Sequence, residues 1–292
     1  DRKTGDAYFD LWFSPYDPNN KLTPPSPFPL AVSTSKNEGP VSFSRDFKSL
    51  LYTQNDNVDG VPKAGRDGVI HTKIYVAVQG KRDWERQGEL PFCSSEYDCM
   101  HPSLSPDGKR LAGTTDNGAK LWDATTGQEL LAFTGHGKGV RTSGIAFSPD
   151  GKWVATTGND AAIQVWVAAT GKVIFVLTGH TGPTFGVAFS PDGRSLASSS
   201  VDHTVKVWQL PAAGSGPVAA PLTLYGHSGA VYRVAFSPDG TRLASAGRDP
   251  VARVYVLPIA DLVAIAQARV TRSLTKEECQ KFLHVDECPR NP

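Results

Sequence analysis

The chain has 292 residues, of which 39% are hydrophobic, and its 28 glycines and 22 prolines are typical of a soluble, turn-rich globular protein. Its formal net charge is +1 and no blocks of Lys or Arg occur, which argues against the basic footprint that nucleic-acid binding needs. No apolar run approaches the roughly 20 residues that span a bilayer, so we expect no membrane insertion within this chain.

The first ninety residues predict short strands joined by polar turns. Residues 7–14 alternate and are rich in aromatic side chains, as a strand would be. Residues 41–47 predict a strand and a tight turn, 49–53 the next strand and 73–78 the third. We expect a long polar loop over 54–70, and we expect residues 90–92 to close this unit.

Part of that loop loosely resembles a calcium-binding loop. Asn55, Asn57, Asp59 and Gly60 match the spacing of oxygen ligands and glycine in an EF-hand, but the twelfth position holds Arg66 instead of the required Glu. A plain polar turn is the preferred interpretation, and calcium binding is the alternative.

The four cysteines form two close pairs, Cys93 with Cys99 and Cys279 with Cys288. Short polar loops of this kind suit local disulfides, which persist in oxidising compartments. We therefore expect an extracytoplasmic location, in the periplasm, at the cell surface or secreted, with the cytoplasm as the alternative. Free thiols are a second possibility. A metal site at Cys279, His284 and Cys288 is the third, but it lacks an evident fourth ligand, so we predict no metal and no cofactor.

From residue 101 onward the chain is repetitive. The tetrapeptide SPDG occurs at 105–108, 148–151, 190–193 and 237–240, and Gly-His occurs at 135–136, 179–180 and 226–227. Each SPDG turn separates two β-rich runs and a third run follows it. A period of 42 to 47 residues with such runs indicates the blades of a β-propeller.

At these residues, over about 101–257, the chain resembles the WD-repeat family. In that family a buried tetrad links the Gly-His histidine, a turn Asp, a strand Ser or Thr and a Trp, which satisfies the buried indole N–H. The resemblance implies two complete tetrads, one of His136, Asp160, Thr156 and Trp166, the other of His180, Asp202, Ser198 and Trp208.

Two other units are incomplete. The last unit offers His227, Asp249 and Ser245 but has Tyr255 in place of Trp. The unit of Trp122 has Asp116 but Gly113 at the hydroxyl position, and His101 lies too close to its first strand, so no tetrad is expected there. His, Asp and Ser also form hydrolase triads, but their recurrence in each unit favours a structural role.

Residues of about 6–112 resemble another family, the TolB-like periplasmic propeller repeats. The resemblance is carried by EGPVSFSRD at 38–46, KIYVA at 73–77 and HPSLSPDGKRLA at 101–112. It implies a hybrid ring in a bacterial cell-envelope protein, with TolB-like blades over 1–100 and WD-type blades over 101–257.

The chain ends with a change of pattern. Residues 259–270 follow a helical period, and Thr275 with Glu278 forms a capping box. We therefore predict an all-β propeller of four-stranded antiparallel blades over 1–257, with a short helical C-terminal extension over 258–292 packed on it. Twenty-one expected strands favour six blade positions, one of them incomplete, with seven as the alternative.

Propellers place function on loops at the mouth of the ring. We expect a non-enzymatic scaffold that binds a protein partner through one face, because aromatic and Arg side chains anchor interfaces. The candidate face consists of Phe185, Tyr232, Arg233, Arg248, Asn159 and Arg141. The alternatives are a hydrolase or lyase with its site in the central funnel, and a structural subunit of a larger envelope assembly.

Overall fold

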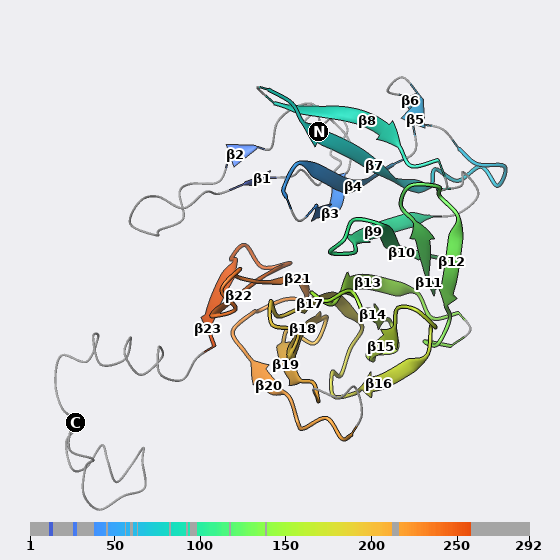
Figure 1. The fold of residues 1–292 in the computed structure, drawn as a ribbon. Helices are drawn as coiled ribbons and strands as arrows, with labels where there is room; N and C mark the ends of the chain where they lie inside the picture. Colours follow the sequence, from blue (N-terminus) through green and yellow to red (C-terminus); the bar gives the residue numbers. More distant parts are fainter. Residues whose placement is uncertain are drawn as a thin grey trace, which may run out of the picture.

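The computed structural model describes residues 12–13, 26–27, 38–44, 46–55, 57–58, 61–62, 64–81, 83–91, 93, 98–116, 118–137, 139–211 and 216–257. Within these ranges the chain forms five antiparallel sheets, the blades of a β-propeller, which follow one another around a ring (Figure 1). The strands in each blade pair in chain order, as in a meander. The first strands of successive blades contact one another in turn, so they form the inside of the ring.

The strands of the five blades have the following bounds. Blade 1 contains β3 (Glu38–Phe43), β4 (Ser49–Asn55), β7 (Thr72–Gln79) and β8 (Trp84–Glu89). Blade 2 contains β9 (Cys99–Leu104), β10 (Arg110–Thr115), β11 (Gly118–Asp123) and β12 (Glu129–Phe133). Blade 3 contains β13 (Thr142–Phe147), β14 (Trp153–Gly158), β15 (Ile163–Val167) and β16 (Val173–Leu177). Blade 4 contains β17 (Thr184–Phe189), β18 (Ser195–Ser200), β19 (Val205–Gln209) and β20 (Leu222–Leu224). Blade 5 has three described strands, β21 (Val231–Phe236), β22 (Arg242–Gly247) and β23 (Arg253–Val256).

Each SPDG turn is held by its own side chains. In blade 3 the Ser148 hydroxyl donates to Asp150 Oδ1 at 2.7 Å, and the same oxygen accepts the amide of Lys152 at 3.0 Å. Gly151 has φ +68°, a left-handed conformation that glycine adopts without strain. Ser44 and Asp46 make the same contacts in blade 1. The tetrapeptide therefore specifies the hairpin locally, and the degenerate first turn keeps its two essential polar residues.

The core lies between neighbouring blades. Phe133 of blade 2 packs against Trp166 of blade 3 with ring centroids 5.2 Å apart. At the inside of the ring, Gly144 and Gly186 lie against the backbone of the next blade's first strand, where an added Cβ would collide with the carbonyl oxygens of Phe185 and Tyr232. Large side chains thus fill the space between the sheets, while glycine lets the inner strands approach closely.

The expected number of blades was wrong. The described residues form five blades rather than six or seven, because the strand predicted over residues 7–14 does not add a blade: within the described chain β1 (Trp12–Phe13) pairs only with β2 (Ser26–Pro27). Two local predictions also need correction. The fourth strand of blade 1 is β8, not residues 90–92, and the loop over 54–70 contains a small hairpin of β5 (Asn57–Val58) and β6 (Val61–Pro62).

The helical extension predicted over 258–292 lies outside the described residues, so it stays a prediction, as does the domain boundary at 257. The described part consists of strands and turns, and it contains no helix that is long and apolar enough to cross a membrane.

Candidate functional site

The structure brings together both tetrads that the WD resemblance implies. In blade 4 the Trp208 indole N–H donates to Ser198 Oγ at 2.9 Å, His180 Nε2 lies 2.9 Å from the same hydroxyl, and His180 Nδ1 lies 2.8 Å from Asp202 Oδ2. In blade 3 the corresponding distances for Trp166, Thr156, His136 and Asp160 are 2.8, 2.8 and 3.1 Å. Each relay runs from the blade interior to a turn at its rim.

Burial and hydrogen bonding set the charge states of the blade 4 relay. Burial is the main cause that lowers the pKa of His180, which keeps the imidazole neutral at pH 7. Burial opposes ionisation of Asp202, but hydrogen bonds from Thr204, the amide of Thr181 and His180 outweigh it and lower the pKa of Asp202 to about 2. The Ser198 hydroxyl that His180 would activate is fully buried and already accepts the Trp208 indole N–H, so a substrate cannot reach it. The relay is therefore structural.

The two incomplete units differ from one another. In blade 5, His227 binds Asp249 and Ser245 as in a tetrad. Tyr255 occupies the Trp position opposite Leu243, and its buried hydroxyl has no hydrogen-bond partner among the described residues. In blade 2, His101 lies within β9 and its Nδ1 is 2.7 Å from Thr114 Oγ1, while Asp116 accepts the amide of Asp98.

Three of the six candidate face residues meet at the inner strands of blades 4 and 5. Phe185 and Tyr232 pack edge to face with centroids 5.4 Å apart, and the guanidinium of Arg233 donates to the carbonyl oxygen of Tyr232 at 2.9 Å. Tyr232 is 38% exposed, so this cluster presents an accessible aromatic ring.

Two arginines act on a histidine of the inner strands. Burial lowers the pKa of Arg233 to about 10, so it stays charged at neutral pH, and among the described residues no carboxylate lies within ion-pair distance of it. Burial first, and then the charges of Arg233 and Arg141, hold the pKa of His101 well below its usual range. His101 and Arg233 lie on β9 and β21, two of the first strands that form the inside of the ring, and Arg141 directly precedes a third, β13. Sequence reasoning did not assign this position to His101, because no motif marks it.

The remaining face residues lie at the same rim. Arg141 is exposed and lies 3.9 Å from Asp98 Oδ2, and the amide of Asn159 donates to the Arg141 carbonyl oxygen. Arg248 is exposed, and its amide donates to the carbonyl oxygen of Ala230. In a meander the connections before the first strand and after the second meet at one rim, opposite the SPDG turns. The rim with these residues is hereafter the binding face.

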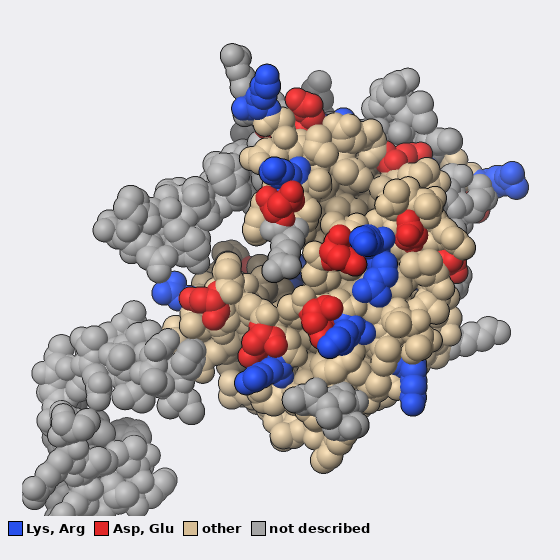
Figure 2. Space-filling view, viewed as in Figure 1, with Lys and Arg blue, Asp and Glu red and all other residues tan. Residues whose placement is uncertain are grey.

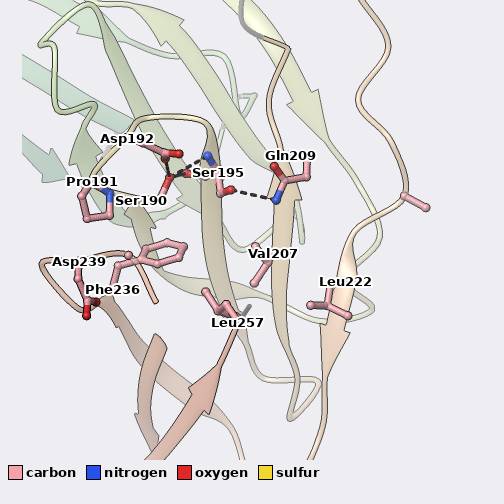
Figure 3. Close-up of a pocket in the computed structure, with 12 residues that line it drawn as sticks. Ser190, Pro191, Asp192, Ser195, Val207, Gln209, Leu222, Phe236, Asp239 and Leu257 are labelled. Carbon is pink, nitrogen blue, oxygen red and sulfur yellow. Dashed lines mark hydrogen bonds between the residues drawn. The ribbon is translucent and has the colours of Figure 1, made fainter. Parts of the chain in front are cut away.

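A cavity of about 710 Å³ lies between blades 4 and 5 (Figure 3). Val207, Leu222, Phe236 and Leu257 form apolar walls, and polar side chains line its edge. These polar side chains hydrogen-bond to one another. The Ser190 hydroxyl donates to Asp192 Oδ1 at 2.6 Å, and Gln209 Nε2 donates to Ser195 Oγ at 2.9 Å. The cavity therefore presents no arrangement of an acid, base and nucleophile.

The cysteine and metal predictions have mixed outcomes. Cys93 and Cys99 form a disulfide, as expected. Cys279, His284 and Cys288 lie outside the described residues, so their pairing stays a prediction. The same holds for calcium at residues 55–60, because Asp59 and Gly60 are not described.

On the face drawn in Figure 2, acidic and basic side chains lie side by side in pairs.

The family described as WD domain, G-beta repeat matches residues 127–167, 171–209 and 220–255. Each match begins at or just before the last strand of one blade and ends with the third strand of the next, so the repeats are offset from the blades by one strand. None of the three matches extends over 6–112, where the TolB-like resemblance remains a prediction.

Three relatives illustrate the similarity. An uncharacterized WD repeat-containing protein of Synechocystis is 39% identical over 163 residues, which are 55% of this chain and 44% of that protein. The Notchless protein homolog of Arabidopsis thaliana is 35% identical over 80 residues, 27% of this chain and 16% of that protein. The target of rapamycin complex subunit wat1 of Schizosaccharomyces pombe is 40% identical over 65 residues, 22% of this chain and 20% of that protein. The chain thus spans less than half the length of these relatives. It contains three WD40 repeats within a β-propeller and is related over that part to WD-repeat proteins.

Proposed function

We propose that this protein is a non-enzymatic scaffold that binds another protein through the binding face of its propeller. WD-repeat propellers typically serve as protein-interaction scaffolds, which supports the general assignment. The observation that carries the proposal is the cluster of Phe185, Tyr232 and Arg233 at the centre of that face. Aromatic and Arg side chains dominate the binding energy of protein interfaces, especially near their centre.

The charge of the face indicates the chemistry of the partner. Arg233 is partly desolvated without a carboxylate partner among the described residues, and Arg141 adds a second positive charge near the axis. A carboxylate brought to this position would form a charge-assisted hydrogen bond with a preorganised guanidinium. The partner segment is therefore acidic, with an apolar side chain that packs against Tyr232.

An enzymatic function is the second candidate, and one observation favours it. His101 is neutral and lies near the axis, where a funnel site would be. Its Nδ1, however, is engaged by Thr114 at 2.7 Å, and the charges that act on it are cations rather than a carboxylate that could orient it as a base. We therefore place the scaffold function first.

The disulfide supports an extracytoplasmic location, because a Cys93–Cys99 bridge persists in an oxidising compartment. Assembly into a larger envelope structure and a bacterial source remain parts of this proposal that rest on the TolB-like resemblance alone. That the protein binds no nucleic acid is also part of this proposal, and it rests on the charge of the sequence.

The test compares two double variants in affinity capture of protein partners from extract of the source cells. Tyr232→Ala with Arg248→Ala removes an exposed aromatic ring and an exposed cation from the binding face. Phe47→Ala with Arg194→Ala removes the same chemistry from the SPDG-turn rim, where Phe47 is 65% exposed. We expect the first pair to weaken capture of the partner by about tenfold or more, and the second to leave it unchanged. Loss of capture in the second pair alone would place the interface on the opposite rim.

A further inference from the structure

A buried histidine and two carboxylates converge at the junction of blades 1 and 2. His71 precedes β7, Asp98 precedes β9 and Asp116 follows β10, and each offers one ligand atom that lies within 4.8 Å of the other two. The two segments of blade 2 come from its start and its second turn, so the fold rather than any local motif assembles the group.

His71 has one nitrogen that the protein does not satisfy. The residue is 6% exposed, its Nε2 lies 3.1 Å from Asp67 Oδ2, and its buried Nδ1 has no hydrogen-bond partner in the part of the chain that the structure describes. If Nε2 carries the proton and donates it to Asp67, the lone pair of Nδ1 faces two carboxylates. A buried acceptor beside negative oxygens is unfavourable unless a cation lies between them.

The carboxylates are already held in place. Asp98 Oδ1 accepts the amide and the hydroxyl of Thr72 at 2.7 and 2.9 Å, and Asp98 itself donates its amide to Asp116 Oδ2 at 3.0 Å. The next residue after Asp98 is Cys99, which the disulfide to Cys93 tethers. Because these contacts fix the segment before any ligand arrives, little conformational freedom is lost on binding.

We propose that His71, Asp98 and Asp116 bind a divalent transition-metal ion, with Zn²⁺ the best match. Zinc accepts both imidazole nitrogen and carboxylate oxygen with bonds of about 2.0–2.2 Å, so its ligand atoms lie about 3.4 Å apart. His71 Nδ1 and Asp98 Oδ1 are 3.6 Å apart, which is already near that separation. Asp67 supplies the outer carboxylate that orients a metal-bound histidine through its second nitrogen.

The site is open on one side. Asp98 is 22% exposed in its side chain and Asp116 is exposed, so water can complete the coordination. Arg141 lies 3.9 Å from the second oxygen of Asp98 and competes for that carboxylate. The ion therefore links blades 1 and 2 at the rim that also carries the binding face.

The test uses the full chain, stripped with EDTA and dialysed against Zn²⁺ in an excess of Mg²⁺, with metal content measured by elemental analysis. We expect one Zn²⁺ per chain and a higher melting temperature with zinc than without. Asp116→Asn keeps an acceptor for the Asp98 amide but removes the charge, and we expect it to weaken zinc binding by about tenfold or more. The matched control is Asp160→Asn in the next blade, whose carboxylate serves the His136 relay, and it should bind zinc as the wild type does.

A second measurement remains informative if a His71→Gln variant fails to fold. Histidine ¹⁵N spectra of the wild-type protein should show the Nδ1 resonance of His71 move to a metal-bound position on addition of Zn²⁺. Two results would overturn the proposal: zinc content unaffected by Asp116→Asn, or an Nδ1 resonance of His71 that is unchanged at saturating zinc.

Discussion

Replacement of Trp208 by Phe tests whether the hydrogen-bonded relay stabilises a blade beyond its packing. The indole N–H of Trp208 is 2.9 Å from Ser198 Oγ, and both residues are buried, at 2% and 0% exposed. Loss of this bond leaves the Ser198 hydroxyl without its donor and costs about 1 kcal/mol. The smaller ring also gives up apolar contact worth about 1 kcal/mol. We therefore expect a loss of about 2 kcal/mol in the free energy of unfolding, or roughly 4–8 °C in melting temperature for a domain of this size.

Tyr255→Phe is the matched control. Tyr255 occupies the corresponding position in blade 5, but its buried hydroxyl has no hydrogen-bond partner within the described ranges. Removal of an unsatisfied hydroxyl is neutral or stabilising, because nothing is lost except its desolvation cost. Urea and thermal unfolding followed by circular dichroism measure both variants. Equal losses of stability for Trp208→Phe and Tyr255→Phe would refute the relay argument.

Three further predictions concern acid and reductant. In the folded protein the pKa of Asp202 is about 2, below its ordinary value of 3.8. Its contribution to the free energy of unfolding is therefore present above pH 4 and is lost as the pH falls toward 2. The shift corresponds to about 2 kcal/mol, and Asp202→Asn should flatten the stability profile in this window; an unchanged profile would contradict the assignment. The pKa of His180 is also lowered, so its contribution to the free energy of unfolding is present above pH 6.5 and declines below that pH. His180→Gln should abolish this decline in the same titration. Reduction of the Cys93–Cys99 bridge, which closes a loop of a few residues, should lower stability by about 2 kcal/mol, and mass spectrometry of a non-reducing digest should recover the linked peptide. Two alkylatable thiols at these positions in the native protein would contradict the bridge.

The parts of the fold that could be predicted from sequence are those that local contacts specify. The SPDG turns and the Gly-His to Asp spacing recur because Ser148, Asp150 and their counterparts satisfy one another within a few residues. Strand β8 could not be recognised, because Trp84–Glu89 is polar and largely exposed and therefore shows no hydrophobic alternation. The blade count failed for a related reason: a short paired segment such as Trp12–Phe13 has the pattern of a blade strand without joining a blade.

The candidate site residues likewise include some that a sequence motif places and others that only the fold brings together. Phe185 and Tyr232 could be predicted because the WD resemblance places them at the starts of inner strands. The group of His71, Asp98 and Asp116 could not, because the three residues are far apart in sequence and belong to no motif. Only the closure of blade 1 against blade 2 brings them together.

Photo-cross-linking tests the central claim, that the binding face holds the protein partner, most directly. The photoreactive analogue benzoylphenylalanine replaces Tyr232 on the binding face in one protein and Phe47 on the opposite rim in another. We predict that the analogue at position 232 becomes covalently linked to an acidic segment of the captured partner, while the analogue at position 47 does not. Cross-linking to the partner from position 47 and none from position 232 would contradict the account.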